Sequence, residues 1–242
     1  YRTSLGLLEL RITGIILNLT HNAVNIITGK FKPNHIILVI EDFPAEIANC
    51  GTGHARGFGV GNENLFNGNT NIRTPNIDKL ATEGVRLESF YGMPVCTPSR
   101  AALMTGRYPM RLGLQTLVIF PNHTYGLPTD ERTLPQALKD AGYRTAMVGK
   151  WHLGHSDQKY WPQRRGFDHF YGNLVGEVDY FTRERGGLID WQRNGKFLKE
   201  DGYYTTLIGD EAVRLIAGHD RSKPLFLYFA SLAAHAPYQA PK

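Results

Sequence analysis

The 242-residue sequence contains only two cysteines, Cys50 and Cys96, so it cannot form a disulfide framework. It also lacks an uninterrupted apolar run of the roughly 20 residues that a membrane span needs. The apolar stretches near its N-terminus are broken by Glu9, Arg11 and several asparagines. We therefore expect no membrane span.

Clustered basic charge is missing as well. The 27 Lys and Arg against 22 Asp and Glu give a formal net charge of +5, but no block of five or more basic residues occurs. This spread charge suits an anionic substrate and predicts no nucleic-acid partner. No fixed-period repeat is visible, and the length fits one sizeable domain or two small ones.

Residues 1–32 form an atypical N-terminal segment. They lack the basic start, apolar centre and cleavage site of a secretory signal. A remnant of a processed precursor, a peripheral hairpin and a tail all stay open as interpretations. Two sequons, at Asn18 and Asn122, would permit N-glycosylation in a secretory pathway, although such tripeptides also occur by chance.

Apolar runs alternate with helical patterns along the rest of the chain. The runs predict strands at 35–40, 85–91, 144–148 and 225–229, and the patterns predict helices at 76–83, 133–141 and 205–217. Continuous apolar runs are typical of strands buried on both faces. We expect an α/β fold with a largely parallel central sheet flanked by helices.

Polar residues follow three of these strands. Glu41 and Asp42 come after the first strand, Lys150 and His152 after the third, and His235 after the last. Ligands of open α/β sheets bind at the carboxyl ends of the strands, so these side chains are expected to converge. The two carboxylates would suit Ca²⁺ or Mg²⁺, although a solvated turn is an alternative for them.

The segment from Cys96 to Arg107 is the most informative. Thr97 is expected as the N-cap of a short helix with Pro98 at its first position, and Gly106 as its end. The N–H groups of such a helix start favour an anion, and Arg100 matches a sulfate or phosphate oxygen pair. A lone cysteine could instead be a buried structural residue.

This motif resembles the signature of the type I sulfatases in the alkaline phosphatase-like superfamily, nearest the arylsulfatase B type. The matching residues are Cys96, Pro98, Ser99, Arg100, Thr105, Gly106 and Arg107. The Gly-Lys-Trp-His element at 149–152 and His235 before Ala-Pro also resemble that family. The resemblance implies that residues 33–242 are the N-terminal part of a sulfatase catalytic domain, with the C-terminal part of the family fold missing.

The resemblance also implies roles for five residues. A formylglycine-generating enzyme would oxidise Cys96 to formylglycine, whose hydrated aldehyde attacks sulfur. Arg100 and Lys150 would bind sulfate, His152 would contact the aldehyde hydrate, and His235 would protonate the leaving oxygen.

A divalent cation, Ca²⁺ with Mg²⁺ as the alternative, is implied as well. Its ligands would be Glu41, Asp42 and residue 96, although the family has Asp where this chain has Glu41. Further family ligands would come after Lys242, so we expect weak or no activity from this chain alone.

The implied function is a sulfuric ester hydrolase acting on a sulfated sugar, a glycosaminoglycan or an aryl sulfate, in a lysosomal, secreted or periplasmic setting. Two other functions stay open. One is a phosphate or phosphonate ester hydrolase of the same superfamily. The other is an inactive module that binds sulfated glycans through Arg100, Lys150 and His235.

Overall fold

The computed structural model describes the backbone of 36–41 and residues 93, 95–233 and 235–242. The expected helix at 76–83, the expected strand at 85–91, residues 1–32, Cys50 and Asp42 lie outside this part.

The main sheet of the described residues combines parallel strands with a short antiparallel edge. Its order is β1-β8-β2-β3-β6-β7. The first four of these, β1 (Ile36–Glu41), β8 (Leu225–Ala230), β2 (Arg144–Lys150) and β3 (His169–Asn173), are mutually parallel. The expectation of a largely parallel sheet flanked by helices is confirmed. The strand predicted at 35–40 is found shifted by one residue, and the strands predicted at 144–148 and 225–229 extend to Lys150 and Ala230.

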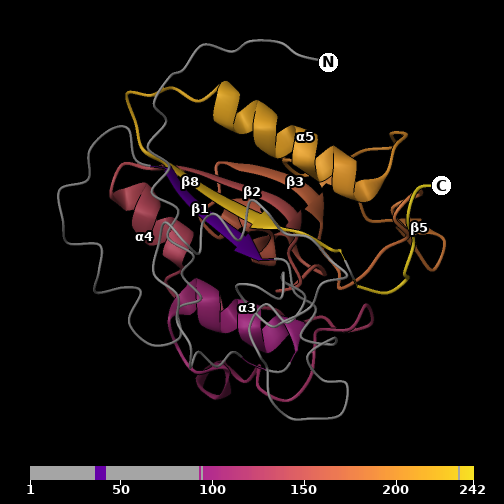
Figure 1. The fold of residues 1–242 in the computed structure, drawn as a ribbon. Coiled ribbons are helices and arrows are strands. Elements are labelled where there is room, and N and C mark those ends of the chain that lie inside the picture. The colour runs from indigo at the N-terminus through magenta and orange to yellow at the C-terminus, as the bar shows by residue number, and fades with distance from the viewer. Residues whose placement is uncertain (1–35, 42–92, 94, 234) are drawn as a thin grey trace, which may run out of the picture.

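The helices cover both faces of this sheet. Figure 1 shows α5 (Tyr204–Ala217) on one side, and α3 (Cys96–Thr105) and α4 (Leu134–Asp140) on the other. Alternate residues of a strand point to opposite faces, so each strand supplies two cores. In β8, Phe226 and Tyr228 join the core beneath α3 and α4, whereas Leu225 and Leu227 join the core beneath α5.

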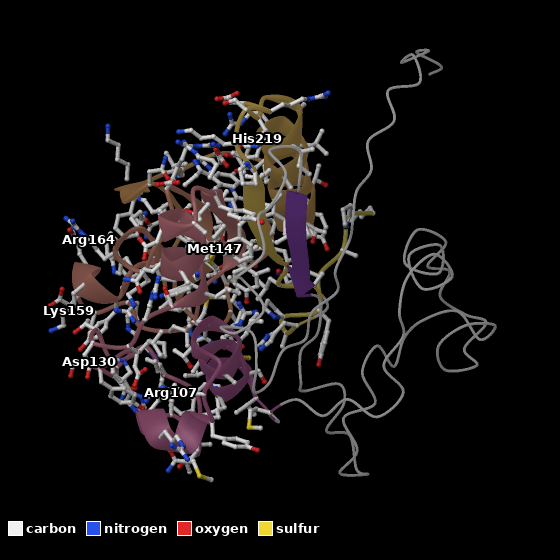
Figure 2. All side chains as sticks on the ribbon, turned by 90° about the vertical axis from the view of Figure 1, so that its left-hand side faces the viewer. Arg107, Asp130, Met147, Lys159, Arg164 and His219 are labelled. Carbon is white, nitrogen blue, oxygen red and sulfur yellow. The ribbon has the colours of Figure 1, made fainter. Side chains whose placement is uncertain are left out.

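Strand β2 shows the same alternation. Met147 is fully buried among the side chains on the α3 side and lies deep inside the molecule in Figure 2, while Ala146 and Val148 face α5. Burial on both faces explains why this strand reads as a continuous apolar run.

The predicted helix ends follow from local chemistry. Thr133 caps α4 in a capping box with Gln136, each side chain accepting from the other residue's backbone N–H. Gly106 ends α3 in the left-handed conformation at φ 65°, as expected from its lack of a Cβ.

Short elements fill the connections. They are the 3-10 helices η3 (Pro109–Leu112), η4 (Gln158–Tyr160) and η5 (Pro162–Arg164) and the strands β4 (Glu184–Arg185), β5 (Leu188–Ile189), β6 (Gln192–Arg193) and β7 (Lys196–Phe197). Strand β6 pairs antiparallel with both β3 and β7. Among the described helices, none combines the length and apolarity needed to cross a bilayer.

Candidate active site at the start of α3

The site is built where the parallel strands end. Glu41 of β1 pairs in register with Ala230 of β8, and Ala230 pairs on its other side with Gly149 of β2. The backbone thus brings the ends of three strands into one row, and Lys150 follows directly. The convergence expected from the sequence holds for these backbone positions.

Cys96 is the first residue of α3. Val95, in extended conformation, is the N-cap residue, so the helix begins earlier than the sequence suggested. The prediction of Thr97 as N-cap is therefore wrong. Thr97 lies inside the first turn, and its hydroxyl binds two neighbouring loops instead of capping the helix. It donates to the His152 carbonyl at 2.9 Å and accepts from the Ile119 N–H at 3.1 Å.

Lys150 places a buried cation against the thiol. Its Nζ donates to Cys96 Sγ at 3.0 Å, and its residue exposure is only 2%. It is the last residue of β2 rather than part of a segment after it. A buried ammonium is costly unless it is compensated by an anion or a strong acceptor, so this contact favours an anionic group at position 96.

The electrostatic environment stabilises the thiolate. Burial raises the pKa of Cys96, but the hydrogen bond from His235 and the charges of Lys150 and Arg100 outweigh burial and leave the pKa below its usual value. This is the environment of a reactive cysteine rather than an inert one. Cys96 is buried, and no disulfide to it occurs among the residues that the structure describes.

Arg100 lies one turn further along α3 and is buried in contact with the backbone of Lys150. Its Nη1 donates to the Lys150 carbonyl and to the Tyr228 hydroxyl, the latter at 3.2 Å. Arg100 therefore fixes the end of β2 as well as supplying charge. Tyr228 was read only as part of an apolar strand, and no sequence signal distinguished its hydroxyl from the core around it.

His152 lies in the left-handed backbone region with φ 59°, just after β2. An extended segment would have placed Lys150 and His152 on one side, and this φ rules that arrangement out. Its Nε2 lies 3.0 Å from the Ile119 carbonyl, which can only accept, so Nε2 carries the proton. Burial, aided by the charges of Lys150 and Arg100, holds the pKa of His152 well below its usual value. The ring is therefore neutral near pH 7.

His235 approaches the thiol from the loop after β8. It hydrogen bonds to Cys96, and its Nδ1 lies 2.7 Å from the Ala236 carbonyl and 3.7 Å from Glu177 Oε2. The five predicted catalytic positions therefore lie within one connected cluster of described residues. Glu177 was missed because it comes from a loop without a local signal.

Two glycines shape the site, one of them unexpectedly. A Cβ at Gly149 would lie 1.9 Å from the Ala230 carbonyl oxygen, so the neighbouring strand requires glycine there. Gly176, which was not predicted, makes room for His152, since a Cβ there would lie 2.3 Å from its Cε1.

Of the predicted metal ligands Glu41, Asp42 and residue 96, the structure describes residue 96 and the backbone of Glu41. The backbone of Glu41 lies at the carboxyl end of β1, in the row of strand ends beside the cluster. Within 93, 95–233 and 235–242, no group of three or more His, Cys, Asp or Glu side chains could hold a metal ion. Carboxylates such as those of Glu41 and Asp42 suit a hard cation by donor chemistry, while Asp42 and the side chain of Glu41 lie outside the part of the chain that the structure describes.

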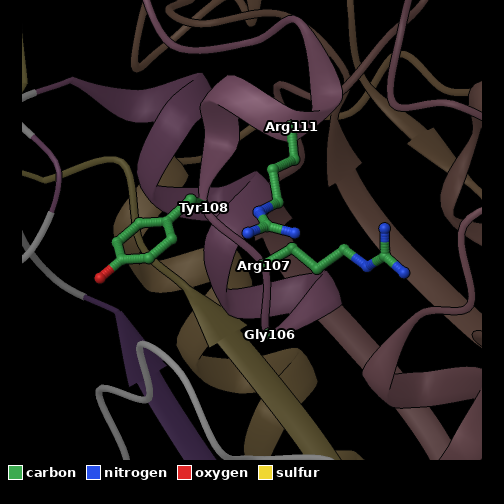
Figure 3. Close-up of a pocket in the computed structure, with 4 residues that line it drawn as sticks. All are labelled: Gly106, Arg107, Tyr108 and Arg111. Carbon is green, nitrogen blue, oxygen red and sulfur yellow. The ribbon is translucent and has the colours of Figure 1, made fainter.

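A surface pocket of about 210 Å³ lies at the other end of α3, lined by Gly106, Arg107, Tyr108 and Arg111 (Figure 3). The ten residues of α3 separate it from Cys96 by about 15 Å at 1.5 Å per residue. Arg107 is paired there with Glu131 at 3.2 Å. This pocket is therefore separate from the candidate active site.

The described residues thus form an α/β fold with a reactive residue at a helix start and buried cations near the strand ends. Residues 33–242 match the family model described as Sulfatase, and the chain belongs to the sulfatase family.

Relatives agree with this placement. Arylsulfatase J of Mus musculus is 46% identical over 178 residues, covering 70% of this chain and 30% of the relative. N-acetylgalactosamine-6-sulfatase of Mus musculus is 39% identical over 195 residues, covering 72% of this chain and 37% of the relative. The chain thus spans about a third of the length of these relatives.

A solved structure, Ps i-CgsB in complex with k-i-k-neocarrahexaose, superposes with a TM-score of 0.67 at 32% identity. The match covers 85% of this chain and 46% of that one. The arrangement of sheet and helices is therefore shared with a solved relative over most of the present chain.

Proposed function

We propose that the protein hydrolyses sulfate esters of a sulfated carbohydrate or an aryl alcohol. The observation that carries this proposal is the meeting of Lys150 Nζ and His235 at Cys96 Sγ, at the start of α3. Two relatives are named as an arylsulfatase and an N-acetylgalactosamine-6-sulfatase, and a solved relative binds an oligosaccharide, which supports this substrate class.

The reactive group requires modification of Cys96. Oxidised by a formylglycine-generating enzyme, residue 96 would supply a hydrated aldehyde whose hydroxyl attacks sulfur. Glu41, Asp42 and residue 96 would hold Ca²⁺ or Mg²⁺, which when bound adds positive charge beside the sulfuryl oxygens.

Two cations of the chain stabilise the negative charge of the sulfuryl group. Lys150 Nζ already contacts the side chain of residue 96, so it lies within reach of an oxygen on a group bonded there. Arg100 adds a second buried charge and holds the Lys150 carbonyl in place. Such preorganised charges act most strongly where water is excluded.

The two histidines are suited to different proton transfers. His235 contacts residue 96 and has Glu177 3.7 Å from its Nδ1, so it is placed to hold a proton and donate it to the leaving oxygen. His152 is neutral, and its Nδ1 has no hydrogen-bond partner among the described residues. His152 can therefore accept a proton when sulfate is released.

The test is turnover by the full-length protein after co-expression with a formylglycine-generating enzyme, because residues 1–242 alone are expected to have weak or no activity. The account expects hydrolysis of an aryl sulfate faster than of the matching aryl phosphate, and its loss in Cys96→Ala. Faster phosphate hydrolysis would instead support the phosphate or phosphonate esterase. Binding of sulfated glycans without turnover, after oxidation of Cys96 has been verified, would support the binding module.

The proposal also covers the domain organisation of the chain and the compartment of the protein. Residues 33–242 would form the N-terminal part of the catalytic domain, with residues 1–32 as a separate segment. Because formylglycine formation and sulfated glycans belong to secretory and periplasmic settings in this family, the protein would be lysosomal, secreted or periplasmic.

A further inference from the structure

The loop that follows Ile119 presents a glycosylation sequon at its tip. Phe120 to His123 form a turn in which the His123 N–H donates to the Phe120 carbonyl at 2.9 Å. Pro121 and Asn122 occupy the two central positions of the turn, where proline and asparagine are favoured. Asn122 and Thr124, the two residues that define the sequon, are both exposed.

The loop is anchored on both sides of this tip. The Pro121 carbonyl lies 3.0 Å from His155 Nε2, and the Thr124 carbonyl accepts from Ser156 Oγ at 2.7 Å. On the loop side these contacts use only backbone carbonyls, so they do not involve the Asn122 side chain. The loop is therefore anchored while Asn122 at its tip stays exposed.

An exposed aromatic ring stands two residues before the acceptor. Phe120 keeps 39% of its surface exposed, so part of its ring is open to solvent. Its ring meets His123 edge-on at 5.4 Å between centroids, and His123 stacks on Tyr125 at 4.9 Å. The negative faces of aromatic rings attract C–H groups, such as those of a pyranose ring.

We propose that Asn122 carries an N-linked glycan whose first sugar packs against Phe120. A lipid-linked oligosaccharide pyrophosphate is the donor. The Asn122 Nδ2 bonds to C1 of the first sugar, the C1–O bond to pyrophosphate breaks with its electron pair, and the amide proton leaves with the lipid pyrophosphate. No redox change is involved.

The experiment expresses the full chain with a secretory leader in insect cells and follows the tryptic peptide spanning residues 112–132. Treatment with peptide N-glycosidase F in heavy-oxygen water converts a glycosylated asparagine into labelled aspartate. We expect this label at Asn122 in the wild type and in Thr124→Ser, and its loss in Asn122→Gln and Thr124→Ala. Asn18→Gln is the matched control, because it removes the other sequon and leaves this peptide unchanged.

A second measurement tests the contact with Phe120. Removing the glycan from the wild type should lower the melting temperature by about 2–4 °C. The same treatment should leave the melting temperature of Phe120→Ala unchanged while still labelling Asn122.

The peptide is analysed from both the cell lysate and the medium. If Asn122 is unlabelled in protein that has entered the secretory pathway, the proposed glycosylation is wrong. An equal temperature shift in wild type and Phe120→Ala overturns the contact.

Discussion

At the residue scale, the chemistry of the site depends on charges gathered around one side chain. Lys150 and His235 contact Cys96 directly, and Arg100 lies beneath them. The same charges that lower the pKa of the thiol would stabilise an anion held at this position after oxidation.

The first prediction concerns Lys150. In unmodified protein, Lys150→Met removes a charge and a hydrogen bond that lower the Cys96 pKa, so the pKa should rise. Alkylation of Cys96 would then be slower at pH 7, with its midpoint moved to higher pH. Lys159→Met is the matched control, because Lys159 is exposed and pairs only with Asp157 and the Tyr160 ring among the described residues. An unchanged midpoint in Lys150→Met would contradict the assigned contact.

The second prediction concerns the space that Gly176 leaves for His152. Gly176→Ala places a methyl group against the His152 ring and should reduce kcat/KM for an aryl sulfate by at least about tenfold. The pH profile should also change, since the ring moves relative to its partners. Gly209→Ala in α5 is the control: nothing lies within 4 Å of the added Cβ, and stability should rise by about 0.5–1 kcal/mol. Wild-type kinetics in Gly176→Ala would argue against a role for His152 placement.

At the element scale, α5 is joined to the sheet by an ion network around the buried Glu211. Glu211 of α5 contacts Arg193 of β6, Arg214 of its own helix, and His169 of β3, whose Nε2 lies 2.7 Å away. Burial raises the pKa of Glu211, but the hydrogen bonds from Arg214 and Arg193 outweigh burial and hold the pKa at about 2.

The third prediction is the pH dependence of this network. Because the folded-state pKa of Glu211 lies below its ordinary 4.5, its contribution to stability is present above about pH 4.5 and lost as the pH falls toward 2. Glu211→Gln should cost about 1–2 kcal/mol at pH 7, because it weakens the hydrogen bonds to Arg193 and Arg214, whose side chains are themselves 36% and 60% exposed. Urea unfolding at pH 7 and pH 3 would measure the free energy of unfolding of the wild type and of the variant. The difference between the two free energies should be smaller at pH 3. A difference that grows on acidification would contradict the network.

The elements also show what a sequence can predict. Strands β2 and β8 contain continuous apolar runs and α5 has helical spacing of its apolar residues, so these three elements were predicted from the sequence. Strand β3 mixes His, Gly and Asn with aromatics, and β6 and β7 have two residues each, so no local pattern marks them. Tertiary packing alone brings Tyr228 to Arg100, Gly176 to His152 and Glu177 to His235, because the two members of each pair lie far apart along the chain.

At the scale of the whole molecule, the sheet brings the ends of β1, β8 and β2 together and α3 closes against them. The site should therefore bind a tetrahedral dianion even without turnover. Inorganic sulfate should raise the melting temperature by about 5–10 °C at 100 times its Kd, which corresponds to about 2.7 kcal/mol.

Sulfate also stabilises proteins by exclusion from their surface, so a control must separate the two effects. In Lys150→Met, sulfate should raise the melting temperature only by the amount that exclusion from the surface causes. Sodium chloride at matched ionic strength should raise the melting temperature of neither protein. Equal shifts in the wild type and Lys150→Met would show that sulfate does not bind beside Cys96.

The central claim is that residue 96 is the modified, sulfur-attacking group of a sulfatase. Mass spectrometry of the tryptic peptide spanning residues 87–100, from protein co-expressed with a formylglycine-generating enzyme and active on an aryl sulfate, tests it most directly. The account predicts an aldehyde at position 96 in the active fraction. A fully active preparation that carries an intact thiol there would contradict it.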